Sequence, residues 1–207
     1  MYDLIVGHTH SAAKTVFDSL CQKAVKEEKD EIEKKGMSPT NLKVSGDGSW
    51  NKRGFISLFG VTTLIGYYSG KVIDLVVKSS YCQACTVWHK KKGTAEYAEW
   101  YEDHQEECAS NHDGSAGIME VDSITEMFST SEQKYGVKYG NYIGDGDSKT
   151  FKAILDLNPY GDDFQVKKTE CVSHVEKQMG SRLRNVKKEQ KLGGRGKLTD
   201  TLIKKLG

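Results

Sequence analysis

Four soft metal ligands in the middle of the chain have the spacing of a structural zinc site. Cys82-x-x-Cys85 is followed, after 22 residues, by Cys108-x-x-x-His112. The two ligands of each closely spaced pair can coordinate a metal from one turn of the chain. A helix over residues 94–107 would bring the two pairs together. A closed set of four ligands leaves no open position, so the metal would be structural rather than catalytic.

Two alternatives to this ligand set stay open at the level of sequence. His89 or His104 could replace one ligand, or the cysteines could be free thiols with His112 on the surface. The segment of about 81–117 is rich in Cys, His, Lys and Glu and poor in aliphatic residues. Such a segment would fold poorly without a metal, so the sequence predicts an inserted Cys/His module that binds Zn²⁺.

Two aspartates beside glycine could carry catalytic chemistry. Asp47 lies in Ser-Gly-Asp-Gly-Ser-Trp and Asp145 in Ile-Gly-Asp-Gly-Asp-Ser-Lys. Two carboxylates at adjacent strand ends can hold Mg²⁺ or Mn²⁺, and a pair of ions about 4 Å apart supports phosphodiester cleavage. Such a site normally uses a third acid. The alternative is an ordinary pair of turn residues, because aspartate and glycine are common in turns.

The C-terminal part of the chain is basic. Residues 165–207 carry 12 Lys or Arg and 4 Asp or Glu, whereas the whole chain has a net charge of +1. Such a segment can neutralise nucleic-acid phosphates, although a solvated helix face has the same composition. Cys171-x-x-His174 opens this segment and is either half of a metal site or a buried thiol beside a histidine. The candidate nucleic-acid contacts are Lys177, Arg182, Arg184, Lys187 and Lys188.

The overall composition is that of a globular α/β domain. Hydrophobic residues make up 37% and charged residues 29%, with two prolines, which excludes collagen-like and wholly disordered chains. No apolar run reaches the length of a membrane helix and no signal-peptide pattern is present, so we expect neither a membrane partner nor secretion. Five cysteines, an odd number without an export signal, favour a reducing compartment.

Hydrophobic periodicity predicts a mixed sheet with an antiparallel edge and helical crossovers. Asp47 and Asp145 both fall at strand ends, where sites form in open α/β sheets. The predicted helices span residues 12–35, 94–107, 118–135, 148–157 and 172–186, and the predicted strands span residues 41–50, 55–68, 71–78, 137–143 and 164–168.

Longer motifs around these residues resemble the Mutator-like transposase domain of animal mobile elements. The resemblance covers residues 42–207 and leaves residues 1–41 as an N-terminal helical segment. It implies a ribonuclease H-like mixed sheet flanked by helices, with three metal-binding acids of the DDE type that cut DNA ends and transfer strands. The matching motifs are Val44-Ser-Gly-Asp-Gly-Ser-Trp50, Gly60-Val-Thr-Thr-Leu-Ile-Gly-Tyr67, Ser79-Ser-Tyr-Cys-Gln-Ala-Cys85, Tyr139-Gly-Asn-Tyr-Ile-Gly-Asp-Gly-Asp-Ser-Lys149 and Cys171-Val-Ser-His174.

The resemblance also assigns roles to single residues. Asp47 matches the first acid, Asp145 matches the second, and Cys171 with His174 matches a Cys-x-x-His element that follows the second acid. The third acid of the family, a glutamate in an Asn-Glu-Ser-Phe-Asn-like stretch, has no match in the sequence. Glu176 lies too close to the Cys-x-x-His element to take that role, and so does Glu189, so we expect a partial catalytic domain.

The resemblance implies Mg²⁺ or Mn²⁺ as catalytic cofactor beside structural Zn²⁺, with DNA and a transposase multimer as partners. Nuclear location follows from the DNA role, and a cytoplasmic location is expected otherwise. The alternative function is a non-catalytic, zinc-stabilised DNA-binding or transposase-derived interaction module.

Overall fold

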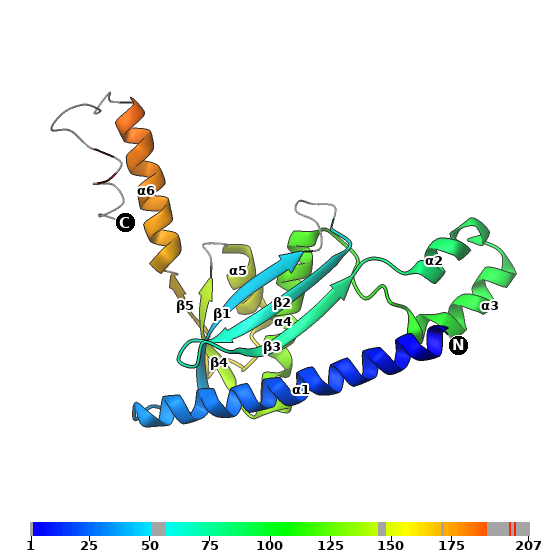
Figure 1. The fold of residues 1–207 in the computed structure, drawn as a ribbon, viewed down its shortest axis with the longest axis horizontal. Helices are drawn as coiled ribbons and strands as arrows, with labels where there is room; N and C mark the ends of the chain where they lie inside the picture. The colour runs from blue at the N-terminus through cyan, green and yellow to red at the C-terminus, as the bar shows by residue number, and fades with distance from the viewer. Residues whose placement is uncertain are drawn as a thin grey trace.

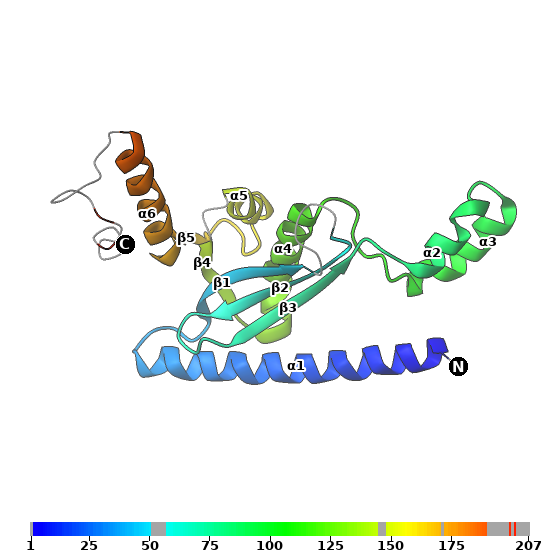
Figure 2. The ribbon, with the colours of Figure 1, turned by 45° about the horizontal axis from the view of Figure 1, so that its top comes forward.

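A five-stranded mixed sheet flanked by helices forms the body of the protein (Figures 1 and 2). The computed structural model describes residues 2–50, 57–144, 148–170, 172–189, 199 and 201. The elements are α1 (Tyr2–Lys34), β1 (Asn41–Trp50), β2 (Phe59–Gly66), β3 (Val72–Ser79), α2 (Gln83–Trp88), η1 (His89–Lys91), α3 (Ala95–His104), η2 (Gln105–Glu107), α4 (Ala116–Tyr135), β4 (Lys138–Gly144), α5 (Ser148–Leu157), β5 (Lys167–Glu170) and α6 (Val172–Glu189).

The strand order is β3-β2-β1-β4-β5. β1, β2 and β3 pair antiparallel, whereas β4 pairs parallel to β1 and β5 pairs parallel to β4. The β1–β2 register runs from Val44↔Gly66 to Trp50↔Gly60, and the β1–β4 register ends at Ser45↔Ile143. The predicted mixed sheet with an antiparallel edge is therefore confirmed.

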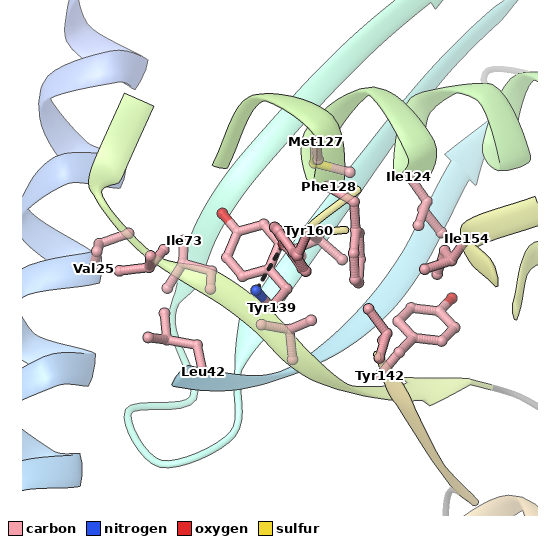
Figure 3. Close-up of a cluster of buried hydrophobic side chains, with 14 of the residues drawn as sticks. Val25, Leu42, Ile73, Ile124, Met127, Phe128, Tyr139, Tyr142, Ile154 and Tyr160 are labelled. Carbon is pink, nitrogen blue, oxygen red and sulfur yellow. Dashed lines mark hydrogen bonds between the residues drawn. The ribbon is translucent and has the colours of Figure 1, made fainter. Parts of the chain in front are cut away.

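The core lies between the sheet and α4, which packs on β2 and β3 and is contacted by α5. Phe128 of α4 meets Tyr139 and Tyr142 of β4 edge to face, with ring centroids 5.3 and 6.0 Å apart. The Tyr139 amide donates a hydrogen bond of 2.8 Å to the hydroxyl of Tyr160 (Figure 3). The Tyr160 hydroxyl also forms a hydrogen bond with the Ser131 hydroxyl. Because its hydroxyl is satisfied, Tyr160 can be buried there without a desolvation penalty.

Helix α1 is longer than expected, because it begins at Tyr2 rather than near residue 12. Its second half packs against β3 and contributes Val25 and Ile32 to the core. In its first half, Val16 and Phe17 are exposed. Once a packed segment nucleates a helix, each further residue adds one hydrogen bond, so the helix continues where no proline stops it.

A buried glutamate fastens α1 to the turn between β2 and β3. The side chain of Glu28 is fully buried and accepts hydrogen bonds from the amides of Tyr68 (3.0 Å) and Ser69 (2.6 Å). A Cβ at Gly66 would lie 2.6 Å from a Glu28 carboxylate oxygen. The turn therefore needs glycine at Gly66 so that the carboxylate can reach the backbone.

A second buried acid ties the edge strand β3 to α4 and β4. Asp74 accepts hydrogen bonds from the hydroxyls of Tyr135 (3.2 Å) and Tyr139 (3.3 Å) and from the amide of Leu75 (3.0 Å). Burial raises the pKa of Asp74, although Lys134 and these hydrogen bonds oppose the increase. The carboxyl is thus a structural anchor in the core.

Two other elements differ from expectation. Strand β5 begins at Lys167 rather than Phe164, because the Phe164 ring packs on Tyr160 with centroids 5.6 Å apart and belongs to the core instead. The short helix α2 was not expected. Among the described residues, no helix combines the length and the apolar composition that crossing a membrane requires.

We predict that Glu28→Ala lowers the free energy of unfolding by about 2 kcal/mol, because two buried amides lose a charged acceptor. Urea denaturation followed by circular dichroism measures this change. Glu27→Ala, which removes an exposed ion pair with Lys71 from the same helix turn, is the control and should cost much less than Glu28→Ala, because solvent screens that pair. Equal losses in the two variants would contradict the anchoring role of Glu28.

Candidate metal centres

Four ligand atoms converge in the insert between β3 and α4. The Sγ atoms of Cys82, Cys85 and Cys108 and a ring nitrogen of His104 all lie within 4.8 Å of one another. His104 Nε2 is 3.3 Å from Cys82 Sγ and 3.4 Å from Cys85 Sγ, and the Cys85 and Cys108 sulfurs are 3.5 Å apart. Ligand atoms around tetrahedral zinc are separated by about 3.5–3.8 Å, so this Cys3His cluster could bind zinc.

Local structure explains how the four ligands come together. Cys82 precedes the first turn of α2 and Cys85 lies within it, so both sulfurs come from one turn. The Thr94 hydroxyl caps α3 by accepting a hydrogen bond from the Tyr97 amide at 3.1 Å, and α3 then ends at His104. Cys108 follows directly after η2.

A stack of aromatic rings fixes the orientation of His104. Trp88 of α2 stacks on Trp100 of α3 with ring centroids 4.8 Å apart, and Trp100 also stacks on the His104 imidazole with centroids 4.5 Å apart. Trp100 and His104 are four residues apart, so they share one face of α3. The stack therefore joins the two helices and holds the imidazole at the cluster.

The electrostatics of the cluster favour a cation. Burial opposes ionisation of Cys82, but hydrogen bonds from the backbone of Cys85 and Ala109 and from His104 lower the pKa of the Cys82 thiol to about 6. Burial and the neighbouring sulfurs of Cys108 and Cys82 raise the pKa of Cys85. One thiolate therefore forms readily, and a bound divalent cation would compensate the repulsion that resists further ionisation.

The structure differs from the favoured sequence assignment at the fourth ligand. His112 is not part of the cluster: its side chain is 3% exposed and its Nδ1 lies 3.2 Å from an oxygen of Asp122 on α4. The His112 amide also donates to the carbonyl of Ser79 at 3.0 Å, which holds this residue against the sheet. His89, the other alternative, is exposed in η1 and also lies outside the cluster.

Hydrogen bonds close the base of the insert. Asn111 donates its amide to the Ser79 carbonyl at 2.8 Å, accepts from the Ser79 amide at 2.8 Å and donates its side-chain amide to Val77 at 3.1 Å. Residues 80–110 thus leave and re-enter the body at one point on β3. Figure 1 shows the resulting insert as a separate lobe beyond the sheet.

Of the two candidate catalytic acids, the structure describes Asp47 alone. Asp47 lies on β1 and is exposed, but it is not at the strand end that the sequence predicted, because pairing with β2 continues β1 to Trp50. Its carbonyl accepts a hydrogen bond from the Thr63 hydroxyl at 3.3 Å. Asp145 lies outside the described residues, but it follows Gly144, the last residue of β4, directly in the sequence.

The C-terminal candidates are on or next to α6. Cys171 lies outside the described residues, and His174 and Lys177 are in the first half of the helix. In the second half, Arg182 and Arg184 are exposed. Lys188 is exposed as well, and Lys187 is half-buried. Figures 1 and 2 show α6 extending away from the sheet, at the opposite end of the molecule from the insert.

Comparison with known families agrees with these features. Residues 5–207 match the family model described as Mutator-like transposase. The chain belongs to the Mutator-like transposase family. No curated protein and no solved structure matches it. The match includes most of α1, so in this Mutator-like transposase chain the family similarity extends over the N-terminal helix as well as the sheet, the insert and α6.

We predict that the chain binds one Zn²⁺ and that His104→Ala weakens binding at least about tenfold, because one of four ligands is lost. His112→Ala is the matched control and should keep full affinity. Chelator competition measures the affinity, and the charge-transfer absorption of the Co²⁺-substituted protein reports thiolate ligation. Loss of binding in His112→Ala with retention in His104→Ala would contradict the ligand set described above.

Proposed function

We propose that this chain forms a ribonuclease H-like DNA-processing core of a Mutator-like transposase, in which Asp47 on β1 and Asp145, the residue after β4, hold Mg²⁺ or Mn²⁺. One observation carries the proposal: β1 and β4 are parallel neighbours at the centre of the sheet. Their register ends at Ser45↔Ile143, and Asp47 and Asp145 each follow two residues after this pair, so we expect the two acids to lie close together although about a hundred residues separate them.

The strand order supports the fold assignment within this proposal. An antiparallel meander of β1, β2 and β3, followed by β4 and β5 added in parallel on the other side of β1, is the arrangement expected for a ribonuclease H-like domain. The carboxylates fit the proposed ion, because Mg²⁺ and Mn²⁺ prefer oxygen ligands. When bound, such ions activate the attacking oxygen and stabilise the leaving oxygen of a phosphodiester.

In this proposal, cation binding and the stability of the insert depend on different parts of the chain. Asp47 is exposed within β1, and the Thr63 hydroxyl donates a hydrogen bond to its carbonyl, so its backbone is fixed while its carboxylate is accessible. The Cys3His cluster would give the insert a rigid core without taking part in the chemistry, because its four positions are filled by protein ligands. A nuclear location would follow from action on DNA.

We predict that the full chain, loaded with zinc, nicks supercoiled plasmid in the presence of Mn²⁺. Asp47→Asn should lower the rate at least about a hundredfold, because it removes an anionic ligand from the proposed site. Asp163→Asn, a change of an exposed aspartate beyond α5, is the control and should keep the wild-type rate. Equal nicking by the two variants, or no Mn²⁺-dependent nicking by the wild type, would contradict the catalytic proposal.

Helix α6 favours a second function, namely DNA binding without chemistry. Arg184 and Lys188 are four residues apart, so both exposed cations lie on one face of the helix. The helix extends away from the sheet (Figure 2), so a DNA duplex could contact it without steric hindrance from the body. A product that kept α6 and lacked cleavage activity would act as a DNA-binding or interaction module, with a second transposase subunit as its further partner.

We predict that the double change Arg184→Gln and Lys188→Gln weakens duplex DNA binding and lowers the salt dependence of log K by about two, because two phosphate contacts are lost. Fluorescence anisotropy at several salt concentrations measures both quantities. Lys90→Gln with Lys92→Gln removes the same charge from exposed sites in the insert and should leave the slope unchanged. A slope that is the same in all three proteins would exclude α6 as the DNA contact.

A further inference from the structure

Helix α6 has an exposed apolar side. Met179, Leu183 and Val186 follow one another at spacings of four and three residues, so they form one stripe along the helix, here called the apolar stripe. Met179 is 40% exposed and Val186 is 38% exposed, whereas Leu183 is half-buried. Because α6 extends away from the sheet (Figures 1 and 2), a partner could pack on this stripe.

The basic residues of α6 determine the chemistry of that partner. Residues 179–189 include four Lys or Arg and one Glu. Arg182 borders the apolar stripe, because it lies four residues before Val186. Arg184 and Lys188 lie on the opposite side of the helix. Two α6 helices that paired through the stripe would bring like charges together, so the favoured partner surface is acidic as well as apolar.

Helix α3 of the insert has both properties. Residues 95–107 include six Asp or Glu and neither Lys nor Arg. Tyr97 and Tyr101 lie four residues apart on one side of α3, and their rings stack with centroids 5.8 Å apart. Tyr101 is 41% exposed and Tyr97 is half-buried, so these two rings form a surface, here called the tyrosine face. Tyrosine is enriched in protein–protein interfaces because it combines an apolar ring with a polar hydroxyl.

The apolar stripe and the tyrosine face lie at opposite ends of the molecule. The insert leaves the sheet at β3 and α6 follows β5, and these are the two edge strands. Figures 1 and 2 show α3 and α6 far apart on either side of the body. Helix α6 therefore does not cover α3 of its own chain, and contact between the two surfaces requires a second copy.

We propose that α6 of one copy packs on α3 of a second copy, with the apolar stripe against the tyrosine face and the basic residues of α6 beside the acidic residues of α3. The contact joins two different surfaces, so a closed pair forms when each copy gives its α6 to the other. It leaves the side of α6 that carries Arg184 and Lys188 exposed to DNA. The inference goes beyond the proposed function, because it depends neither on cleavage nor on a cation at Asp47.

Sedimentation velocity of the zinc-loaded full chain measures this self-association. Met179→Asp places a carboxylate in the apolar stripe, where it would face the acidic residues of α3, and Tyr101→Asp places one in the tyrosine face. We expect each change to weaken self-association at least about tenfold. Asn185→Asp adds the same charge at an exposed position of α6 outside the stripe. It is the matched control and should associate nearly as the wild type does.

A mixture of the two variants identifies the contact. Met179→Asp keeps an intact α3 and Tyr101→Asp keeps an intact α6, so an equimolar mixture should associate through one α6–α3 contact although neither variant associates alone. A mixture that stays as dissociated as the separate variants would overturn the proposal, and so would wild-type association of Tyr101→Asp by itself. The latter result would mean that α6 packs on a surface other than α3.

The unmutated protein provides a test that does not depend on the folding of a variant. Charge screening should weaken self-association at least about tenfold between about 50 and about 500 mM NaCl. Self-association that strengthens with salt would indicate pairing of the basic helices with one another and would overturn the proposal. A wild type that stays monomeric would overturn it as well, and a DNA affinity that then falls in Met179→Asp but not in Asn185→Asp would assign the stripe to DNA.

Discussion

β1 and β4 pair in parallel, so the chain between them has to cross back over the sheet, and α4 makes that crossing. The crossing buries Phe128 and its neighbours against the strands and creates the core of the domain. It also places the end of β4, which Asp145 follows in the sequence, beside the strand that carries Asp47. The core and the proposed cation site therefore follow from the same strand pairing.

The insert is stabilised by different interactions from those of the body. Its helices α2 and α3 have no buried residues, so packing alone gives them little stability. Stacked rings and four converging ligands take the place of an apolar core, and Asn111 ties both ends of the segment to β3. A metal that links the two helices would therefore contribute folding free energy directly.

Features that depend on a local sequence pattern were predicted from the sequence. Features that depend on contacts between residues far apart in the chain were missed. Alternation and helical periodicity were enough for the mixed sheet, and cysteine spacing was enough to single out Cys82, Cys85 and Cys108. Spacing alone left both His104 and His112 as candidates for the fourth ligand. In the structure His104 stacks on Trp100 and lies in the cluster. Glu28 resembles the other glutamates of its helix in the sequence, and no local pattern shows that its carboxylate reaches the backbone of the turn after β2.

The proposed function depends on a divalent cation beside β1, and anomalous diffraction from crystals of the zinc-loaded chain soaked in Mn²⁺ would locate that ion. We expect a manganese peak coordinated by the carboxylates of Asp47 and Asp145. No manganese peak beside β1, or a peak there that neither carboxylate contacts, would contradict the proposal.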